Sequence, residues 1–224
     1  MQVAGLQQAG RGLMAKPLDL MLVGATGVVG TQVLALALAD SRFAKVVAPT
    51  RRPLPANEKL LNPVVDFNAL PADAPWWKVD AVICTLGTTI RAAGSQAAFA
   101  AVDLELPVRI GRFARQAGAT HYALNSSMGA SHKGNFYLRT KAQAETALRA
   151  IGYPFFTIVR PSLIDAKREH ARLLESAGIV LMRALGPLIP RRYRVVKPDR
   201  IARALIEGAL TQTPGENIVE SEHL

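Results

Sequence analysis

The chain has 224 residues, half of them hydrophobic, which suits one domain with a sizeable core, and its apolar runs fall short of the roughly 20 residues that a membrane-spanning helix needs. Its single cysteine, Cys84, excludes an intrachain disulfide and is typical of a reducing compartment, so we expect a cytoplasmic protein. The net charge of +10 is compatible with nucleic acid as a partner, but few aromatic residues lie among the basic ones, so we do not expect nucleic-acid binding as the main role.

Apolar runs alternate with helical stretches over most of the chain, in the order of repeated strand–helix–strand units. The apolar runs are nearly continuous, which is typical of parallel strands that are covered on both faces. The expected strands are residues 18–23, 45–48, 63–67, 80–86, 120–124 and 153–159. The expected helices are residues 28–39, 95–117 with a kink or break at Pro107, and 136–150. This order predicts an α/β fold with a doubly wound, mostly parallel sheet.

The chain divides by pattern into three segments of a single domain. Residues 1–16 are an N-terminal extension, 17–165 form the sheet core, and 166–224 form a C-terminal helical segment that completes the domain as a small substrate or lid region. In the last segment we expect helices at 167–185 and at 199–211, an irregular stretch at 186–198, and a short edge strand in NIVE, residues 217–220. Asp199 is the expected N-cap of the second of these helices.

A glycine-rich turn joins the first expected strand to the first expected helix, in LMLVGATGVVG at residues 20–30. Gly24 lets the backbone turn off the strand, Gly27 lets a pyrophosphate approach the backbone N–H groups, and Gly30 lets the helix pack closely on the sheet. The helix N-terminus adds unpaired N–H groups and a positive dipole end. A purely structural turn is the alternative, but the flanking strand and helix favour dinucleotide binding. The expected contacts are Gly24, Thr26, Gly27, Val28, Val29 and Gly30.

The second strand ends in a basic turn made of Thr50, Arg51 and Arg52, with no acidic residue until Glu58. In a sheet of this kind an acid at this place binds the 2′-hydroxyl of NAD, whereas an arginine accommodates the 2′-phosphate of NADP. A guanidinium also suits phosphate through its paired donors. The alternative is a solvated basic loop. We therefore expect NADP(H) as the cofactor in preference to NAD(H).

The ends of the third and fourth strands supply further expected contacts. Asp66 can accept a hydrogen bond from the adenine amino group, or it can form a turn. Small residues in CTLGTT let a cofactor lie across the crevice at the strand ends, so we expect Leu86, Gly87 and Thr88 near the nicotinamide ribose and the pyrophosphate. Cys84 is expected to be a buried packing residue.

A serine pair and a Tyr-x-x-x-Lys pattern follow the fifth strand. Tyr137 and Lys141 are four residues apart, so they share one face of a helix. An ammonium stabilises a neighbouring phenolate, and the tyrosine can then act as general acid toward a carbonyl that receives a hydride. Ser126 or Ser127 can donate a hydrogen bond to the same carbonyl oxygen. The alternative is an ordinary surface pair on a helix.

Together, GATGVVG, TRR, CTLGTT, SSMGA, YLRTK and IVRPS, which span residues 18–165, resemble an atypical short-chain dehydrogenase/reductase of the NAD(P)H-binding kind. The chain is similar in particular to the Tat-interacting-protein oxidoreductase group and its bacterial relatives. The resemblance implies a Rossmann fold and an NADP(H)-dependent oxidoreductase that acts on a carbonyl or alcohol substrate. It implies Ser127, Tyr137 and Lys141 as the catalytic residues, a cofactor contact of Lys141, and Pro161 and Ser162 beside the nicotinamide.

Three features depart from the usual pattern of that family. The spacing from serine to tyrosine is short, the substrate segment after residue 162 is short, and TLGTT stands where an NNAG-type motif is usual, so the asparagine that assists the lysine has no evident counterpart. Some atypical members bind NADP(H) without turnover. The alternative function is therefore a non-catalytic, redox-sensing or regulatory NADP(H)-binding protein.

The remaining features concern metals and macromolecular partners. The histidines show no metal-ligand spacing, so no metal site is expected. The apolar stretch 173–190 is followed by RRYR at 191–194. We expect it to pack on the sheet edge or to contribute to a homodimer, and peripheral contact with an anionic membrane surface is the alternative.

Overall fold

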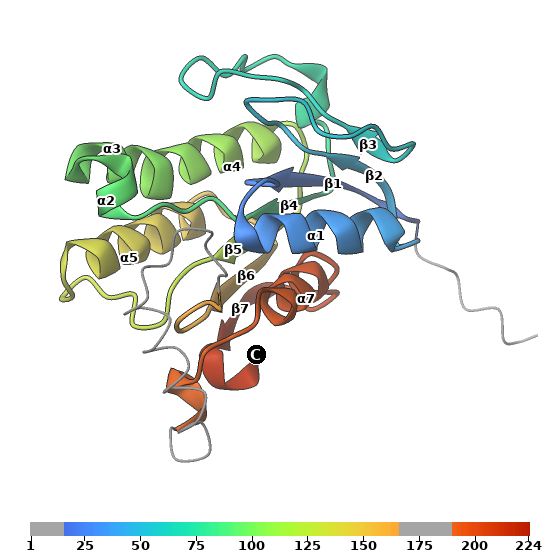
Figure 1. Cartoon of the computed structure of the whole chain (residues 1–224). Coiled ribbons are helices and arrows are strands. Elements are labelled where there is room, and N and C mark those ends of the chain that lie inside the picture. Colours follow the sequence, from blue (N-terminus) through green and yellow to red (C-terminus); the bar gives the residue numbers. More distant parts are fainter. Residues whose placement is uncertain (1–15, 166–189) are drawn as a thin grey trace, which may run out of the picture.

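The structure, a computed structural model, describes residues 16–165 and 190–224, and its centre is a seven-stranded sheet in which every pair of neighbouring strands is parallel (Figure 1). The strand order is β3-β2-β1-β4-β5-β6-β7. The strands are β1 (Leu18–Val23), β2 (Phe43–Val47), β3 (Leu60–Leu61), β4 (Ala81–Cys84), β5 (His121–Asn125), β6 (Phe155–Arg160) and β7 (Gly215–Glu220). The expected doubly wound α/β fold is confirmed.

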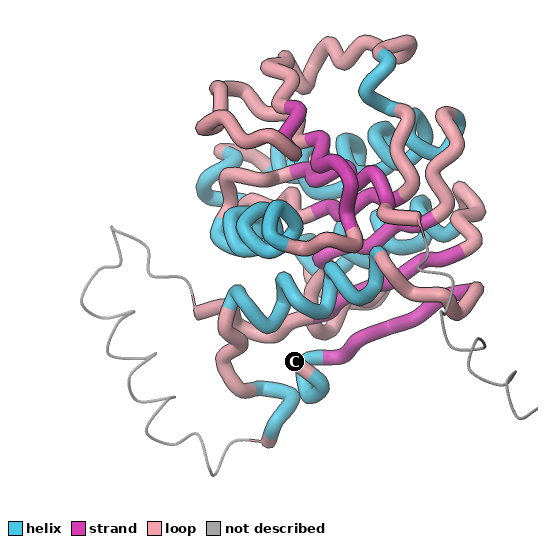
Figure 2. The backbone as a smooth tube through the Cα atoms, turned by 90° about the vertical axis from the view of Figure 1, so that its right-hand side faces the viewer, coloured by secondary structure: helices cyan, strands magenta, loops and turns pink. Residues whose placement is uncertain are grey.

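Helices cover both faces of this sheet, as Figures 1 and 2 show. The described helices are α1 (Val28–Ala39), α2 (Ile90–Ala93), α3 (Gln96–Ala100), α4 (Leu106–Gln116), α5 (Phe136–Arg149) and α7 (Pro198–Ala209). In β1, Leu20 and Leu22 belong to the apolar core under α1 and α7, whereas Met21 and Val23 belong to the core under α4 and α5. Burial on both faces is why residues 20–23 of this strand are all apolar.

The third strand lies earlier than expected, at Leu60–Leu61 instead of 63–67. Pro63 has no N–H to donate, so a regular ladder cannot run through it. The side chain of Asn62 takes over part of the pairing, because its Nδ2 donates to the Ala48 carbonyl at 2.6 Å and to Thr50 Oγ1 at 2.8 Å. Beyond the proline only an isolated bridge joins Thr50 to Val64.

The expected break in the helical stretch 95–117 is confirmed in a particular form. α3 runs into a π-helical turn, Ala101–Glu105, and α4 follows directly, with Pro107 in its first turn. Proline has no N–H to donate, so the regular helical ladder is interrupted at Pro107, directly after the π-helical turn. The turn matters for the site, because it carries the buried residue Asp103.

The C-terminal segment joins the sheet through β7, which pairs with β6 at one edge and confirms the expected edge strand. The sequence predicts Asp199 as the N-cap of α7, and this prediction is wrong. The helix begins at Pro198, so Lys197 is the N-cap and Asp199 lies in the first turn near the positive end of the dipole. The expected helix at 167–185 lies outside the described residues, as does the stretch 173–189. No helix in the two described ranges is long and apolar enough to cross a membrane.

Candidate functional site

The glycine turn lies where the winding of the sheet reverses, because β1 pairs with β2 on one side and with β4 on the other. Gly24 has a left-handed φ of +88°, and a Cβ there would come within 2.7 Å of Thr85 Oγ1. A Cβ on Gly30 would come within 1.9 Å of the Gly24 carbonyl oxygen. Both glycines are therefore required by packing alone, and the turn opens at the carboxyl ends of β1 and β4, where ligands bind in such sheets.

The N-terminus of α1 points its first N–H groups into this turn. Gly27 is the N-cap, and no side chain caps the helix. The first-turn N–H groups of a helix have no intrahelical partner and carry its positive dipole end, so this terminus suits an anion. Val29 packs in the core beneath α1, so only its backbone, not its side chain, is available to a ligand.

A cavity of about 1230 Å³ extends from the glycine turn across the strand ends toward α4. It exceeds the usual range for small-molecule pockets, roughly 300–1,000 Å³, and so has room for an extended ligand. Most of the expected cofactor residues line it: Gly24, Thr26, Gly27, Arg51, Arg52, Asp66, Leu86, Gly87 and Thr88. Four separate segments that the sequence singled out therefore meet at this cavity.

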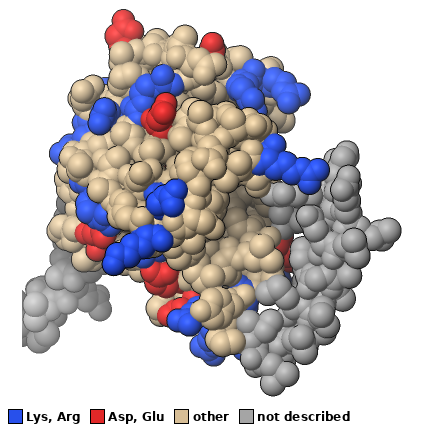
Figure 3. All heavy atoms as spheres, turned by 90° about the vertical axis from the view of Figure 1, so that its left-hand side faces the viewer, with Lys and Arg blue, Asp and Glu red and all other residues tan. Residues whose placement is uncertain are grey.

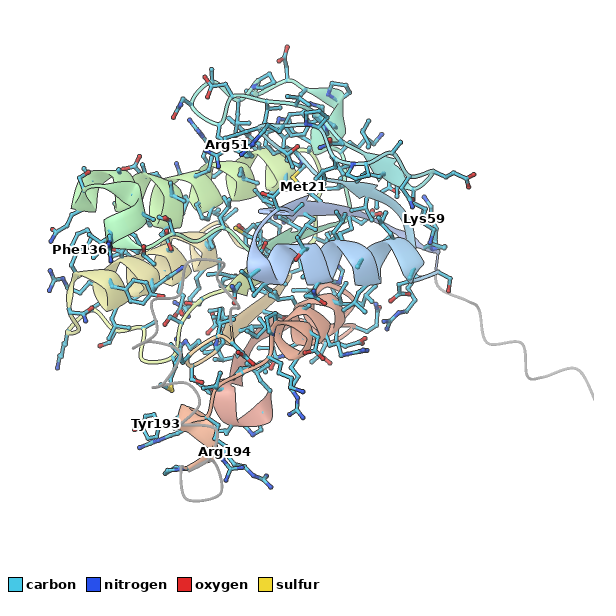
Figure 4. The ribbon with its side chains drawn as sticks, in the orientation of Figure 1. Met21, Arg51, Lys59, Phe136, Tyr193 and Arg194 are labelled. Atoms are coloured by element: carbon cyan, nitrogen blue, oxygen red, sulfur yellow. The ribbon has the colours of Figure 1, made fainter. Side chains whose placement is uncertain are left out.

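The basic turn after β2 is shaped by Thr50, whose hydroxyl donates to the Arg52 carbonyl at 2.7 Å. Figure 4 shows Arg51 in this turn, above the sheet and beside α4. Asp66 both lines the cavity and forms a turn, because one of its carboxylate oxygens accepts from the Asn68 backbone N–H at 2.9 Å. The two interpretations of Asp66 are thus compatible.

Two arginines of α4 line the same cavity and were missed from the sequence. Arg109 donates to the carbonyl of Phe67 and, at 3.5 Å, to that of Asn68, so it joins α4 to the loop that follows β3. Arg112, one helical turn further, also lines the cavity. Their spacing of three residues on a helix was the available signal, but only the fold shows that this face meets the cavity.

The Tyr-x-x-x-Lys pattern lies at the start of α5, whose N-cap Asn135 accepts from the Leu138 N–H at 3.0 Å. The Lys141 ammonium is 6.0 Å from the centre of the Tyr137 ring and 2.7 Å from Asp103 Oδ1. Burial opposes its charge, but the Asp103 carboxylate and Tyr137 outweigh burial and raise the pKa of Lys141. The ammonium lies 3.8 Å from the position of a Cβ on Gly87, so it lies directly behind the cavity wall.

The two serines after β5 differ in their partners. The hydroxyl of Ser126 is buried and donates to Glu145 Oε1 at 2.5 Å, and Glu145 pairs with Arg160 at 2.6 Å. Ser127 is only half-buried, and its hydroxyl donates to the Met128 carbonyl at 3.3 Å. Of the two, Ser127 has the hydroxyl that no carboxylate holds. Glu145 and Arg160 were not expected from the sequence, although Glu145 follows Lys141 by one helical turn.

Some expected site residues do not line the cavity. Ser127, Tyr137 and Lys141 lie outside its lining, and so do Pro161 and Ser162. The Ser162 hydroxyl donates to the Arg194 carbonyl, and its N–H donates to Ser221 Oγ at 3.1 Å. Pro161 accepts from the Met128 N–H at 2.9 Å. Both residues thus pack against neighbouring segments of the chain.

On the face of the molecule near α2 and the start of α5, basic side chains are not gathered into one patch. Figure 3 shows lysine and arginine side chains scattered over the face near α2 and the start of α5. Tyr193 and Arg194 lie on the far side of the molecule from Arg51 (Figure 4). Among residues 16–165 and 190–224, no three His, Cys, Asp or Glu side chains gather as a metal site would require.

A doubly wound parallel sheet, with a glycine turn and an uncapped helix N-terminus opening on a long cavity at its switch point, defines a dinucleotide-binding protein of the Rossmann class. Residues 24–180 match the family model described as NAD(P)H-binding, and the chain belongs to that family.

Similar proteins agree with this assignment. Protein fmp52 of Aspergillus niger is 31% identical and aligns over 91% of this chain and 92% of its own length. Protein HTATIP2 of Rattus norvegicus is 31% identical over 69% of this chain and 66% of its own length. The resemblance to the atypical reductase group stated from the sequence is confirmed.

Solved structures share the fold at lower identity. MoeE5 in complex with UDP-glucuronic acid and NAD is 20% identical and superposes with a TM-score of 0.71 over 91% of this chain and 76% of that one. The reductase domain of PhqB from Penicillium fellutanum is 20% identical, with a TM-score of 0.63 over 91% and 67% of the two chains. These structures share the Rossmann fold of this chain.

The expected cytoplasmic location is wrong. Fmp52 proteins from Aspergillus niger and Emericella nidulans, 31% and 30% identical over 91% of this chain, are designated mitochondrial. A single cysteine indicates a reducing environment but does not distinguish one such compartment from another.

Proposed function

We propose that the chain is an NADP(H)-dependent oxidoreductase of the short-chain dehydrogenase/reductase type, which interconverts a carbonyl and an alcohol. The observation that carries the proposal is the position of the buried Lys141 ammonium, which lies 6.0 Å from the centre of the Tyr137 ring and 3.8 Å from the position of a Cβ on Gly87. This closeness of α5 to the segment after β4, which lines the cavity, supports the proposal.

The residues that line the cavity fit NADP(H) by their chemistry. The first-turn N–H groups of α1 suit the pyrophosphate, and glycine at position 27 leaves the backbone open to it. Arg51 and Arg52 supply guanidinium donors for a 2′-phosphate. This composition supports NADP(H) over NAD(H), because no acidic residue lines the turn after β2 where a ribose 2′-hydroxyl would be held.

In the proposed reaction the side chains of α5 handle the proton. When bound, the nicotinamide supplies or accepts a hydride. Tyr137 donates a proton to the carbonyl oxygen, and the Lys141 ammonium favours the phenolate that remains. The Ser127 hydroxyl donates a hydrogen bond to the same oxygen and orients the substrate.

The direct test of this function is the variant Tyr137→Phe. It keeps the ring but removes the proton donor, so we expect turnover of a carbonyl substrate to fall by about 100-fold or more. Affinity for NADPH should stay within twofold of the parent's. Tyr193→Phe, which removes an exposed phenol at the opposite side of the molecule from Arg51, is the matched control and should keep full activity. Full activity in Tyr137→Phe would refute the mechanism.

A second candidate function is a regulatory or redox-sensing protein that binds NADP(H) without turnover. The observation in its favour is that Ser127, Tyr137 and Lys141 lie outside the lining of the cavity. It predicts tight NADPH binding, no NADPH consumption with a broad panel of aldehydes and ketones, and a protein–protein contact whose affinity changes with cofactor. NADPH consumption by the parent that is lost in Tyr137→Phe would exclude it.

A further inference from the structure

A buried carboxylate joins three elements behind the proposed site. Asp103 lies in the π-helical turn between α3 and α4 and is only 2% exposed. Its Oδ2 accepts from the Thr88 N–H at 2.9 Å, and its Oδ1 is 2.7 Å from the Lys141 ammonium. The same side chain therefore contacts the segment after β4, which lines the cavity, and the helix that carries Tyr137.

Burying this pair destabilises the fold unless both groups are charged. A carboxylate and an ammonium that are both withdrawn from water must neutralise one another, and removing either leaves an uncompensated buried charge. The side chain of Lys141 is 7% exposed and that of Asp103 is fully buried. The pair is therefore fixed in place, and Lys141 has little freedom to move toward solvent.

The carboxylate also changes the field that the ammonium exerts on its neighbours. The ionisable groups that face Lys141 are Asp103 from the π-helical turn, Tyr137 from its own helix and Cys84 from β4. A lone ammonium would strongly favour the phenolate form of Tyr137. A carboxylate 2.7 Å behind the ammonium cancels part of that effect. A neutral amide at the same position can still accept a hydrogen bond from the lysine without this cancellation, although it leaves the ammonium without a counter-charge.

We propose that Asp103 is a positioning residue that holds the Lys141 ammonium at the Gly87 wall and offsets its charge, and so sets the pH at which Tyr137 ionises. It further ties this pair to the backbone of Thr88, so that the cofactor-side segment and the acid–base pair form one unit. The relevance of this arrangement to catalysis rests on the proposed function, whereas the electrostatic effect itself does not.

The test is an alkaline titration of the tyrosines, followed by the ultraviolet absorbance of the phenolate, in protein without cofactor or substrate. The chain has four tyrosines. Burial raises the pKa of Tyr122 and of Tyr153, so both ionise late. Tyr193→Phe serves as the parent and removes the exposed phenol. The first ionisation then reports Tyr137, and adding Tyr137→Phe should abolish it.

In this background Asp103→Asn should lower the midpoint of the first ionisation by about one pH unit, because it removes the negative charge that offsets the Lys141 ammonium. Asparagine is nearly isosteric and can still accept from the Thr88 N–H. Glu105→Gln is the matched control, an exposed acid two residues away on the same turn, and should leave the midpoint unchanged. An unchanged or raised midpoint in Asp103→Asn would overturn the proposal.

A second measurement covers the case in which Asp103→Asn folds poorly. Lys141→Met leaves the Asp103 carboxylate buried and unpaired, whereas Asp103→Asn with Lys141→Met removes both charges. If the pair is coupled as proposed, the double variant unfolds at a higher urea concentration than Lys141→Met alone. Equal or lower resistance of the double variant would contradict the proposal. Neither readout involves NADPH or turnover, so failure here is distinguishable from failure of the proposed function, which Tyr137→Phe tests.

Discussion

The two ends of the proposed site are held in place by different means. At the glycine turn the backbone itself forms the contacts, because Gly24 and Gly30 allow β1, α1 and the end of β4 to meet without a side chain between them. At the α5 end, buried polar pairs hold the side chains in position: Asp103 pairs with Lys141, and Glu145 accepts a hydrogen bond from Ser126. The first end offers bare N–H groups to an anion, whereas the second places ionisable groups behind the cavity wall.

We expect the two ends to have different roles. The glycine turn contains no side chain that titrates, so the affinity of the site for a dinucleotide should vary little with pH apart from the ionisation of the ligand. An end built from coupled charges is sensitive to pH and to single substitutions, as acid–base chemistry requires. Changes at the glycine turn should therefore affect folding and cofactor binding, and changes at α5 should affect turnover.

The largest effect is expected from Gly30→Ala. The new Cβ would lie 1.9 Å from the Gly24 carbonyl oxygen, so α1 must move away from the turn. Overpacking of this kind costs about 3 kcal/mol of the free energy of unfolding, measured by urea denaturation, and NADPH binding should be lost. Gly94→Ala is the control, since its φ is +85° but nothing lies near its Cβ, and it should cost about 1 kcal/mol and keep binding. Equal losses in the two variants would contradict the packing argument.

A smaller effect, confined to the cofactor, is expected from Arg51→Ala. Loss of a charge-assisted contact should weaken NADPH binding by about 10- to 100-fold and leave NADH binding unchanged, because only NADPH carries the 2′-phosphate. Arg203→Ala, at an exposed position on α7, makes the same change in net charge and should alter neither affinity. If Arg203→Ala weakened NADPH binding as much, the effect would be one of overall charge.

The smallest effect concerns His121, which lies far from both ends of the site. Its ring stacks on Phe155 at 4.2 Å, Nε2 is 3.0 Å from the Thr211 carbonyl, and burial lowers its pKa below the ordinary 6.5. Below about pH 6.5 the unfolded chain takes up a proton that the folded chain does not, so stability falls as the pH falls. His121→Gln should reduce the loss in the free energy of unfolding between pH 7 and pH 5 by up to about 1 kcal/mol, measured by urea denaturation at each pH. An unchanged loss would assign the pH dependence to other groups.

The sequence predicts the glycine turn, the basic turn and the Tyr-x-x-x-Lys pair because each is local. A turn, a strand end and one face of a helix involve residues within a few positions of one another, and the rules for them need no tertiary contact. The alternation of strands and helices likewise predicts a doubly wound, mostly parallel sheet, and the short apolar run at 217–220 predicts an edge strand.

The features that were missed depend on contacts between distant segments. Asp103 and Glu105 are both acids in an apolar stretch, and nothing local distinguishes the buried one or indicates its partner, Lys141, 38 positions further on. The early end of β3 reflects Pro63, which cannot donate to a ladder, and the hydrogen bonds of the Asn62 side chain to Ala48 and Thr50, just after β2. The N-cap of α7 was misplaced because a proline at the first helical position outweighs the preference of Asp199 for capping.

The measurement that tests the central claim most directly is a calorimetric titration of the purified, unmodified chain with NADPH and, separately, with NADH. The account predicts NADPH binding in the micromolar range and NADH binding that is at least about tenfold weaker, since the 2′-phosphate contacts contribute at least about 1.4 kcal/mol. Binding of neither cofactor would contradict the assignment of the cavity. Equal binding of both would contradict the role of Arg51 and Arg52.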